Sequence, residues 1–179
     1  TLHGTDITLL GKDKSFKSVI EFAINNSDAV TAVSKSLRKN TMDSFNIQTA
    51  IKVIPNFIDS NLYHYEQDDV LRNSFASSTE KIIIHISNFR KVKRVQDVLN
   101  IFAKINESVP SKLLLIGDGP ERLKMEQLCR NLGLCDSVRF IGKLKAVEKV
   151  LSVSDLFLLP SATESFGLVA LEAMAYSIP

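Results

Sequence analysis

Apolar and polar positions alternate along the chain in short blocks that predict strands separated by helices. Six short apolar runs, rich in Ile, Val and Leu, have the length and composition of buried strands. Strands that alternate with helices favour an α/β fold with parallel sheets flanked by helices. The predicted strands are residues 29–33, 51–54, 82–86, 113–116, 138–141 and 156–159, and the predicted helices are residues 16–26, 35–45, 95–106, 120–132, 146–153 and 168–176.

Local signals agree with these helices. Ser34 is a suitable N-cap, Pro120 stands where a first helical residue tolerates proline, and Gly133 is typical of a residue that ends a helix. Residues 60–79 are polar and irregular, so we place a boundary between residues 58 and 59 and expect two domains. Residues 1–58 hold only two clear strands, too few for a complete doubly wound sheet, and no strand follows the last helix. We therefore expect a fragment truncated at both ends.

Composition and charge limit the classes of protein to which the chain could belong. The 179 residues are 45% hydrophobic and 23% charged, which is typical of a soluble globular chain, and a net charge of +2 gives no reason to expect a nucleic-acid partner. There is no apolar run of bilayer length and no signal peptide, so we expect a cytoplasmic protein without a membrane partner. Cys129 and Cys135 lack a second Cys pair and indicate free thiols rather than zinc ligands or a disulfide. The oligomeric state is not readable from these features.

The segment 164–173 holds two carboxylates eight residues apart across a glycine turn that opens a helix. Glu172 is the only charge on a helical segment that is apolar all round, which predicts a buried helix. A buried carboxylate needs partners, and either ligand hydroxyls or an arginine would supply them. The free amides around residues 166–169 would favour a nearby diphosphate. The spacing alone leaves both interpretations open.

Two further segments follow predicted strands, where open parallel sheets bind ligands. Residues 90–94 contain four cations, which form either a solvated face or a diphosphate clamp, and we select Arg90 and Lys93 for the clamp. Gly117-Asp118-Gly119-Pro120 permits either close approach to a ligand or merely a tight turn. His3 is a lone imidazole beside a glycine, and His85, inside an apolar strand, is predicted to be a satisfied core residue. No D-x-D motif occurs, so no metal is expected.

These segments together resemble glycosyltransferase family 4 in their order and spacing. The matching segments are Thr31-Ala32-Val33-Ser34, Val53-Ile54-Pro55-Asn56, Lys93, Gly117-Asp118-Gly119-Pro120 and Glu164 to Glu172. The resemblance implies a retaining enzyme of the GT-B type, with two Rossmann-like domains facing across a cleft and a nucleotide-sugar donor used without metal. Residues 1–58 would be the C-terminal part of the acceptor-side domain. Residues 59–179 would be the donor domain, incomplete at its C-terminus.

Within the family, residues 1–8 and 85–98 are similar to a branch in bacillithiol biosynthesis that moves N-acetylglucosamine from UDP-N-acetylglucosamine to L-malate. Most of the family reads G-R-L-x-x-x-K-G after this strand. Here Asn88 stands at the usual place of the diphosphate-binding Arg, Lys93 keeps the lysine place, and Arg90 is the candidate replacement guanidinium.

The resemblance also implies the site. Glu172 would bind the ribose hydroxyls, Glu164 a hydroxyl of the donor sugar, and Lys93 and Arg90 the diphosphate, while His3 would face the donor sugar from the other domain. The implied catalytic residues are His3, Arg90, Lys93 and Glu164, the implied donor-binding residues are Asn88, Arg90, Lys93, Gly117, Glu164, Ser165, Phe166, Gly167, Leu168 and Glu172, and the implied acceptor-binding residues are Thr5 and Asp6. The expected partners are the nucleotide sugar and a small acceptor, with no cofactor, and the fragment alone is expected to be inactive.

Two alternatives stay open at this point. A family 4 transferase with another acceptor, such as a lipid, a polysaccharide or a different small molecule, would keep the same donor chemistry. A non-catalytic nucleotide-binding module with a Rossmann-like core would explain the alternation of strands and helices. The second alternative does not explain why Lys93, Glu164 and Glu172 occur together.

Overall fold

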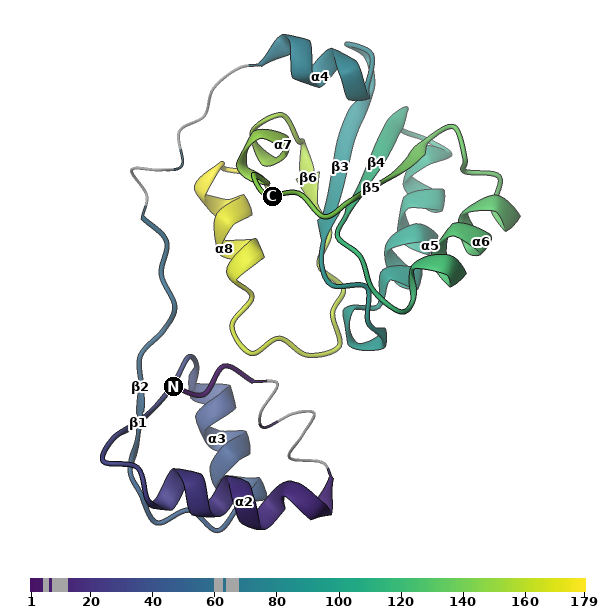
Figure 1. Ribbon diagram of the computed structural model, residues 1–179. Helices are drawn as coiled ribbons and strands as arrows, with labels where there is room; N and C mark the ends of the chain where they lie inside the picture. Colours follow the sequence, from purple (N-terminus) through teal and green to yellow (C-terminus); the bar gives the residue numbers. More distant parts are fainter. Residues whose placement is uncertain (5–6, 8–12, 60–62, 64–67) are drawn as a thin grey trace. The chain divides into compact units, whose positions relative to one another are not determined.

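The computed structural model describes residues 1–4, 7, 13–59, 63 and 68–179. The chain divides into two compact units, each built around its own parallel sheet (Figure 1). The first unit consists of Thr1–Phe57 with Glu164–Leu168, and the second consists of Ile58–Thr163 with Val169–Pro179.

The first unit is a small parallel sheet covered by two helices. Strand β1 (Val30–Ala32) pairs with β2 (Ile51–Val53), and Leu2 extends the sheet through a parallel bridge to Ala32. Helices α2 (Lys14–Asn25) and α3 (Lys35–Ser44) supply apolar side chains to its core. The Ser34 hydroxyl accepts a hydrogen bond from the Leu37 amide at 3.1 Å, which confirms the predicted N-cap of α3.

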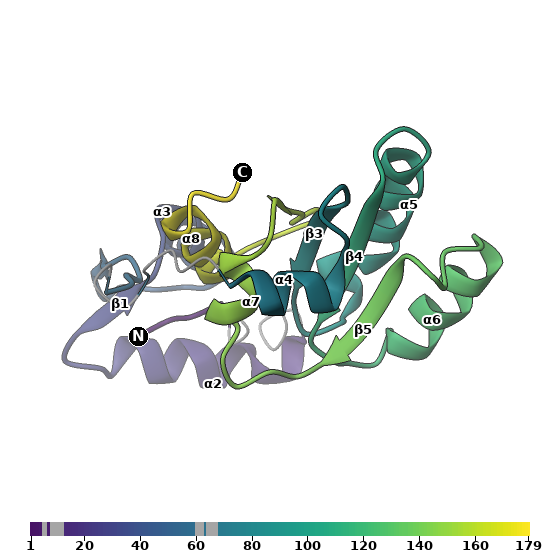
Figure 2. The same cartoon turned by 90° about the horizontal axis from the view of Figure 1, so that it is seen from above.

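The second unit holds a four-stranded, wholly parallel sheet in the order β5-β4-β3-β6. Its strands are β3 (Lys81–Ile86), β4 (Ser111–Ile116), β5 (Val138–Gly142) and β6 (Leu156–Phe157). Helices α5 (Val95–Asn106) and α6 (Arg122–Asn131) pack on one face of this sheet. Helices α7 (Glu148–Ser152) and α8 (Leu168–Ala175) pack on the other face (Figure 2). Because both faces are covered, the central strands are almost continuously apolar, as the sequence pattern predicted.

Helix α4 (Asp69–Phe75) lies where the sequence predicted only irregular structure, so that prediction was wrong. The helix is seven residues long and too short to show a clear period. It is fixed by its surroundings: the Asp68 carboxylate accepts a hydrogen bond from the Leu71 amide at 2.8 Å, and the Arg139 guanidinium lies 6.0 Å from the centre of the Phe75 ring.

Two further expectations about helices need correction. Helix α6 begins at Arg122 rather than at Pro120, because Pro120 and Glu121 form a turn before it. Helix α8 is not buried all round: Ala173 is its only buried residue and the Met174 side chain is 68% exposed. The described part of the chain covers one face of α8, so the uniform apolar composition overstated the burial. Gly133, at φ 68°, follows α6 as the predicted stop.

An ion-pair network joins the start of the sheet to α4. The Arg72 guanidinium donates to the Val153 carbonyl at 2.6 Å and to the Asp155 carboxylate at 2.9 Å. Asp155 also accepts a hydrogen bond from the Ile82 amide at 2.8 Å. Burial alone would raise the pKa of Asp155, but the Ile82 amide and the Arg72 guanidinium outweigh it and hold that pKa below its usual value.

We expect Arg72→Ala to lower the free energy of unfolding by about 2 kcal/mol, because the half-buried Asp155 carboxylate loses the nearer of its two cationic partners and keeps only Lys81, at 3.3 Å. A depressed carboxylate pKa contributes stability that is present above the unfolded-state pKa and is lost as the pH falls through the folded value. The difference between wild type and variant should therefore shrink on acidification below the ordinary aspartate range. Urea unfolding at pH 7 and pH 3 measures both effects. Arg130→Ala, at an exposed position of α6, is the control and should be nearly neutral.

Candidate functional site

The segment after β3 carries the predicted cations, and a buried histidine near the end of the strand precedes it. His85 is fully buried, and its ring nitrogens contact the Leu158 carbonyl and the Ser87 hydroxyl, each at 2.8 Å, which confirms the prediction of a satisfied core residue. Asn88 and Arg90 follow as exposed residues, and the 3-10 helix η3 (Lys91–Lys93) ends at the half-buried Lys93. These cations therefore lie at the carboxyl edge of the sheet, where ligands bind in folds of this class.

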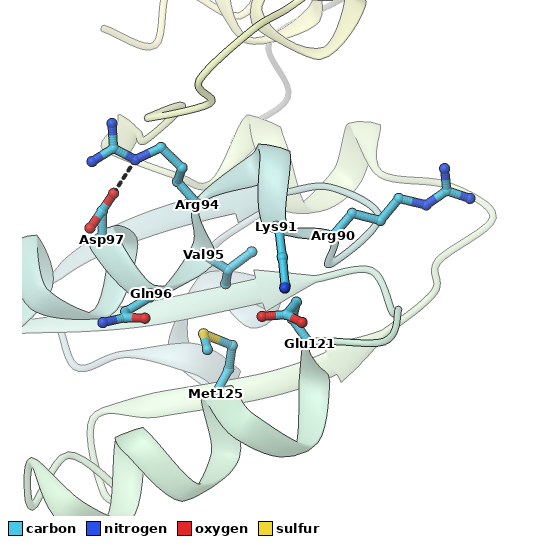
Figure 3. A pocket seen from close by; sticks show the side chains of 8 residues that line it. All are labelled: Arg90, Lys91, Arg94, Val95, Gln96, Asp97, Glu121 and Met125. Carbon is cyan, nitrogen blue, oxygen red and sulfur yellow. Dashed lines mark hydrogen bonds and ion pairs between the residues drawn. The ribbon is translucent and has the colours of Figure 1, made fainter. Parts of the chain in front are cut away.

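A pocket of about 380 Å³ opens beside this segment, between the starts of α5 and α6 (Figure 3). In Figure 3, Lys91 extends toward Glu121, whereas Arg90 points away from both. Arg94 pairs with Asp97 at the edge of the pocket and has a left-handed backbone, with φ 50°. The residues lining the pocket are Arg90, Lys91, Arg94, Val95, Gln96, Asp97, Glu121 and Met125. Arg90 thus borders this pocket, while Lys93 is not among the lining residues.

Gly117 follows β4 and fits closely against the segment after β3. Its φ is 123°, and a Cβ atom there would lie 1.8 Å from the Ser87 carbonyl oxygen. The neighbouring Phe89 amide donates to the Asp118 carbonyl at 3.1 Å, and the Glu121 amide donates to the Phe89 carbonyl at 2.9 Å. The glycines of this turn are therefore required by close packing of two strand-end segments, and contact with a ligand stays a prediction.

We expect Gly117→Ala to destabilise the second unit by about 2 kcal/mol, because it adds both a left-handed backbone penalty and a clash with main chain. Gly133→Ala is the matched control: its φ of 68° is also left-handed, but no heavy atom lies within 4 Å of the added Cβ. The control should cost about 1 kcal/mol, the backbone penalty alone. Urea unfolding of both variants measures the difference, and equal costs would contradict the packing argument.

Glu172 lies on α8, against the core on the other face of the same sheet. Its carboxylate lies 3.5 Å from the Tyr63 hydroxyl, and the Tyr63 ring packs edge-on against Tyr176 with centroids 5.6 Å apart. Burial, together with the nearby charge of Glu148, raises the pKa of Glu172, while the Tyr63 contact opposes that rise. The sequence analysis did not select Tyr63. The sequence marks this residue only as an aromatic side chain shortly after the expected domain boundary.

The other predicted residues belong to the first unit. Ser165 lies against the backbone of Gly4, where a Cβ atom would approach the serine hydroxyl to 1.7 Å, and Phe166 packs on the core of that unit. His3 is exposed and lines a hollow of about 560 Å³ together with Leu168. Glu164 is half-buried, and Gly167 has a φ of 83°. Thr5 and Asp6 lie outside the described residues.

The predicted site thus divides into two groups. Asn88, Arg90, Lys93 and Gly117 lie at one edge of the four-stranded sheet, and Glu172 lies on α8 of the same unit. His3 and residues 164–168 form the second group, in the first unit. The first group contains the cations that an anionic ligand requires.

In the part of the chain that the structure describes, no helix has the length and apolar character to cross a membrane. No three or more His, Cys, Asp or Glu side chains are grouped there as metal ligands would be. Cys129 and Cys135 are free thiols, as predicted. Burial and the nearby Cys135 raise the pKa of the Cys129 thiol to about 11.

Comparison with known proteins places this geometry in context. The family described as glycosyl transferases group 1 matches residues 67–179, and glycosyltransferase family 4 matches residues 1–62. The chain is 52% identical over 180 residues to the N-acetyl-alpha-D-glucosaminyl L-malate synthase of Bacillus anthracis, covering 100% of this chain and 47% of that protein. It is 31% identical over 192 residues to an uncharacterised glycosyltransferase of Methanocaldococcus jannaschii, covering 100% of this chain and 49% of that protein. The chain therefore spans about half the length of the curated relatives it matches.

Solved structures show the same fold. The Anabaena protein HepE in complex with UDP-glucose matches 99% of this chain and 50% of its own, with a TM-score of 0.88 and 24% identity. Sucrose-phosphate synthase from Thermosynechococcus elongatus matches 98% of this chain and 46% of its own, with a TM-score of 0.82 and 24% identity. These likenesses confirm the expected α/β class of GT-B type.

Proposed function

The chain belongs to the glycosyl transferases of group 1, and on this premise we propose that it is part of a retaining enzyme that moves N-acetylglucosamine from UDP-N-acetylglucosamine to L-malate. The observation that carries the proposal is the 52% identity, over the whole chain, to the Bacillus anthracis N-acetyl-alpha-D-glucosaminyl L-malate synthase. The cations at the carboxyl edge of the second sheet and the carboxylate on α8 support a nucleotide-sugar donor.

The residues present fit the binding of such a donor. Lys93 and Arg90 would neutralise the diphosphate, and the Glu172 carboxylate would accept hydrogen bonds from the two ribose hydroxyls. Glu164 would accept a hydrogen bond from a sugar hydroxyl, and the amides at the start of α8 would donate to a phosphate or to the sugar. His3 would contact the donor sugar.

The proposed reaction has one bond formed and one bond broken at the anomeric carbon. The malate hydroxyl oxygen bonds to that carbon from the face that the nucleotide leaves, the carbon–phosphate oxygen bond breaks, and the hydroxyl proton passes to the departing phosphate. Configuration is then retained. The protein orients the reactants and stabilises the charge on the leaving diphosphate through Lys93 and Arg90, with no metal required.

Two measurements test this proposal in order. Isothermal titration of UDP into the folded chain, without and with Mg²⁺, should give the same affinity in both buffers if the cations suffice. A protein that carries this chain and the other half of its relatives' length should then release UDP and form a malate glycoside from UDP-N-acetylglucosamine and L-malate. UDP release without a malate glycoside would favour a family member with another acceptor. Absence of UDP binding to a folded sample would count against a donor site in this chain.

The cytoplasm remains the proposed location. The free thiols of Cys129 and Cys135 are consistent with a reducing compartment, where unpaired cysteines persist. The malate-forming activity, the donor and the acceptor are proposals for the whole protein, of which this chain supplies about half by comparison with its curated relatives.

A further inference from the structure

A single buried imidazole connects the two strand-end segments that lead to the predicted donor residues. His85 is the fifth residue of β3 and none of its surface is exposed. One ring nitrogen, Nδ1, lies 2.8 Å from the carbonyl oxygen of Leu158, the first residue beyond β6. The other, Nε2, lies 2.8 Å from the hydroxyl of Ser87, the first residue beyond β3.

The chemistry of these contacts fixes the position of one imidazole proton. A carbonyl oxygen only accepts hydrogen bonds, so Nδ1 must carry the proton that it shares with Leu158. A neutral imidazole then has an acceptor at Nε2, which receives the Ser87 hydroxyl proton. The neutral Nδ1–H tautomer therefore satisfies both contacts without a charge in the sheet.

The Ser87 end of this link is also held by its neighbours. The Ser87 amide donates to the Ile116 carbonyl at 3.0 Å, and the Ser87 carbonyl lies against Gly117, where no Cβ would fit. The Phe89 ring, fully buried, stacks on the imidazole with centroids 6.4 Å apart. The position of Ser87 consequently sets the start of the segment that ends in Lys93.

The Leu158 end is held at two points. The Leu158 amide donates to the Ile84 carbonyl at 2.9 Å, and four residues later the Ala162 amide donates to the Val92 carbonyl of η3 at 2.9 Å. Between them, the Ser161 hydroxyl is buried and has no hydrogen-bond partner among the described residues, so it adds no bond of its own. Residues 158–163, which lead directly to Glu164, are thus tied to β3 near one end and to η3 near the other.

We propose that His85 is a positioning residue of the donor site, which holds the segment bearing Lys93 and the segment leading to Glu164 in one fixed relation through its two hydrogen bonds. The inference rests on the proposed function, because it concerns the diphosphate that Lys93 would bind. His85 touches neither substrate nor reacting atoms in this role. Its effect should appear in recognition of the second phosphate rather than of the nucleoside.

Titration of UDP and UMP into the folded chain tests this role. For His85→Leu we expect UDP affinity to fall about tenfold while UMP affinity changes less than about twofold, because a displaced lysine segment loses contact with the second phosphate. His85→Gln retains one N–H donor and one oxygen acceptor and should recover most of the UDP affinity. Equal losses for UDP and UMP, or no loss for either, would overturn the proposal.

The variant Ser87→Ala and an imidazole NMR spectrum test the same role independently of His85→Leu. Ser87→Ala removes one of the two hydrogen bonds without changing the core imidazole, and it should lower UDP affinity about threefold with UMP unaffected. If His85→Leu does not fold, this variant decides, and unchanged UDP affinity would overturn the role. An imidazole ¹⁵N–¹H correlation spectrum should show the proton on Nδ1, and a proton on Nε2 alone would overturn the linkage. Failure of the wild-type chain to bind UDP or UMP would overturn the proposed function, even with the predicted tautomer present.

Discussion

Lys93→Ala is expected to lower the turnover number about a thousandfold in a protein that carries this chain and its missing half. Positioned cations that meet charge developing in the transition state contribute about two to three orders of magnitude to rate. Lys93 is half-buried at the end of η3, whereas Lys91 at the start of the same helix is exposed. Initial rates of UDP release at saturating UDP-N-acetylglucosamine and L-malate measure the effect.

Lys91→Ala is the matched control for this prediction. Lys91 belongs to the same short helix and has the same charge, but its side chain is exposed and extends toward Glu121 in Figure 3. We expect the turnover number of this variant to stay within about twofold of wild type, because an exposed charge in water contributes little. Wild-type turnover in Lys93→Ala would remove Lys93 from the proposed diphosphate site. A similar loss in both variants would indicate a general effect of positive charge instead.

Glu172→Ala is expected to weaken UDP binding about a hundredfold. A carboxylate that accepts two hydroxyl hydrogen bonds contributes roughly 1.5 kcal/mol through each, and about 1.4 kcal/mol corresponds to a factor of ten in affinity. Calorimetric titration of UDP into the variant measures the loss. Titration of pyrophosphate, which lacks the ribose, provides the control and should give the same affinity in wild type and variant. Unchanged UDP affinity would favour the alternative in which Glu172 has only a structural role.

The pH dependence of UDP affinity gives the same prediction a second test. In the proposed role, the ionised Glu172 carboxylate accepts from both ribose hydroxyls, and its pKa is raised by burial and by the charge of Glu148. As the pH is lowered, UDP affinity should therefore begin to decline at a pH at which an ordinary glutamate is still ionised. Glu148→Gln removes the neighbouring charge, so it should lower the pKa of Glu172 and move the decline to lower pH. Titrations across the acidic range in wild type and Glu148→Gln measure this shift.

The sequence predicted the regular elements well where burial and local signals agree. Strands β3 and β4 are apolar because helices cover both faces of the sheet, and that requirement is visible as a continuous run of Ile and Leu. The start of α3 was visible in Ser34, because a hydroxyl at an N-cap acts on an amide three residues away. These interactions are local or depend only on composition.

Elements fixed by distant contacts were not predictable. Helix α4 depends on Arg139, which is 65 residues from the Ser74 carbonyl that it also contacts. Apolar composition predicted a buried α8, but burial is decided by which face meets the sheet. The sequence indicated that His85 is a satisfied core residue. Its contact with Leu158 was not predictable, because that residue lies 73 residues later and is brought close only when β6 pairs with β3. The clustering of Asn88, Arg90, Lys93 and Gly117 followed from their positions at strand ends, since parallel strands bring those ends to one edge.

The strand order of the second sheet has a consequence for how the chain folds during synthesis. Strand β6 pairs with β3, and the residues that begin this contact, Ile82 and Asp155, are 73 residues apart. At ordinary translation rates, β3 leaves the ribosome roughly 4 to 15 s before its partner. In that interval one edge of β3 is without its native neighbour, in a strand that contains three consecutive isoleucines. Chaperone capture of the nascent chain should therefore be greatest between the emergence of β3 and that of β6.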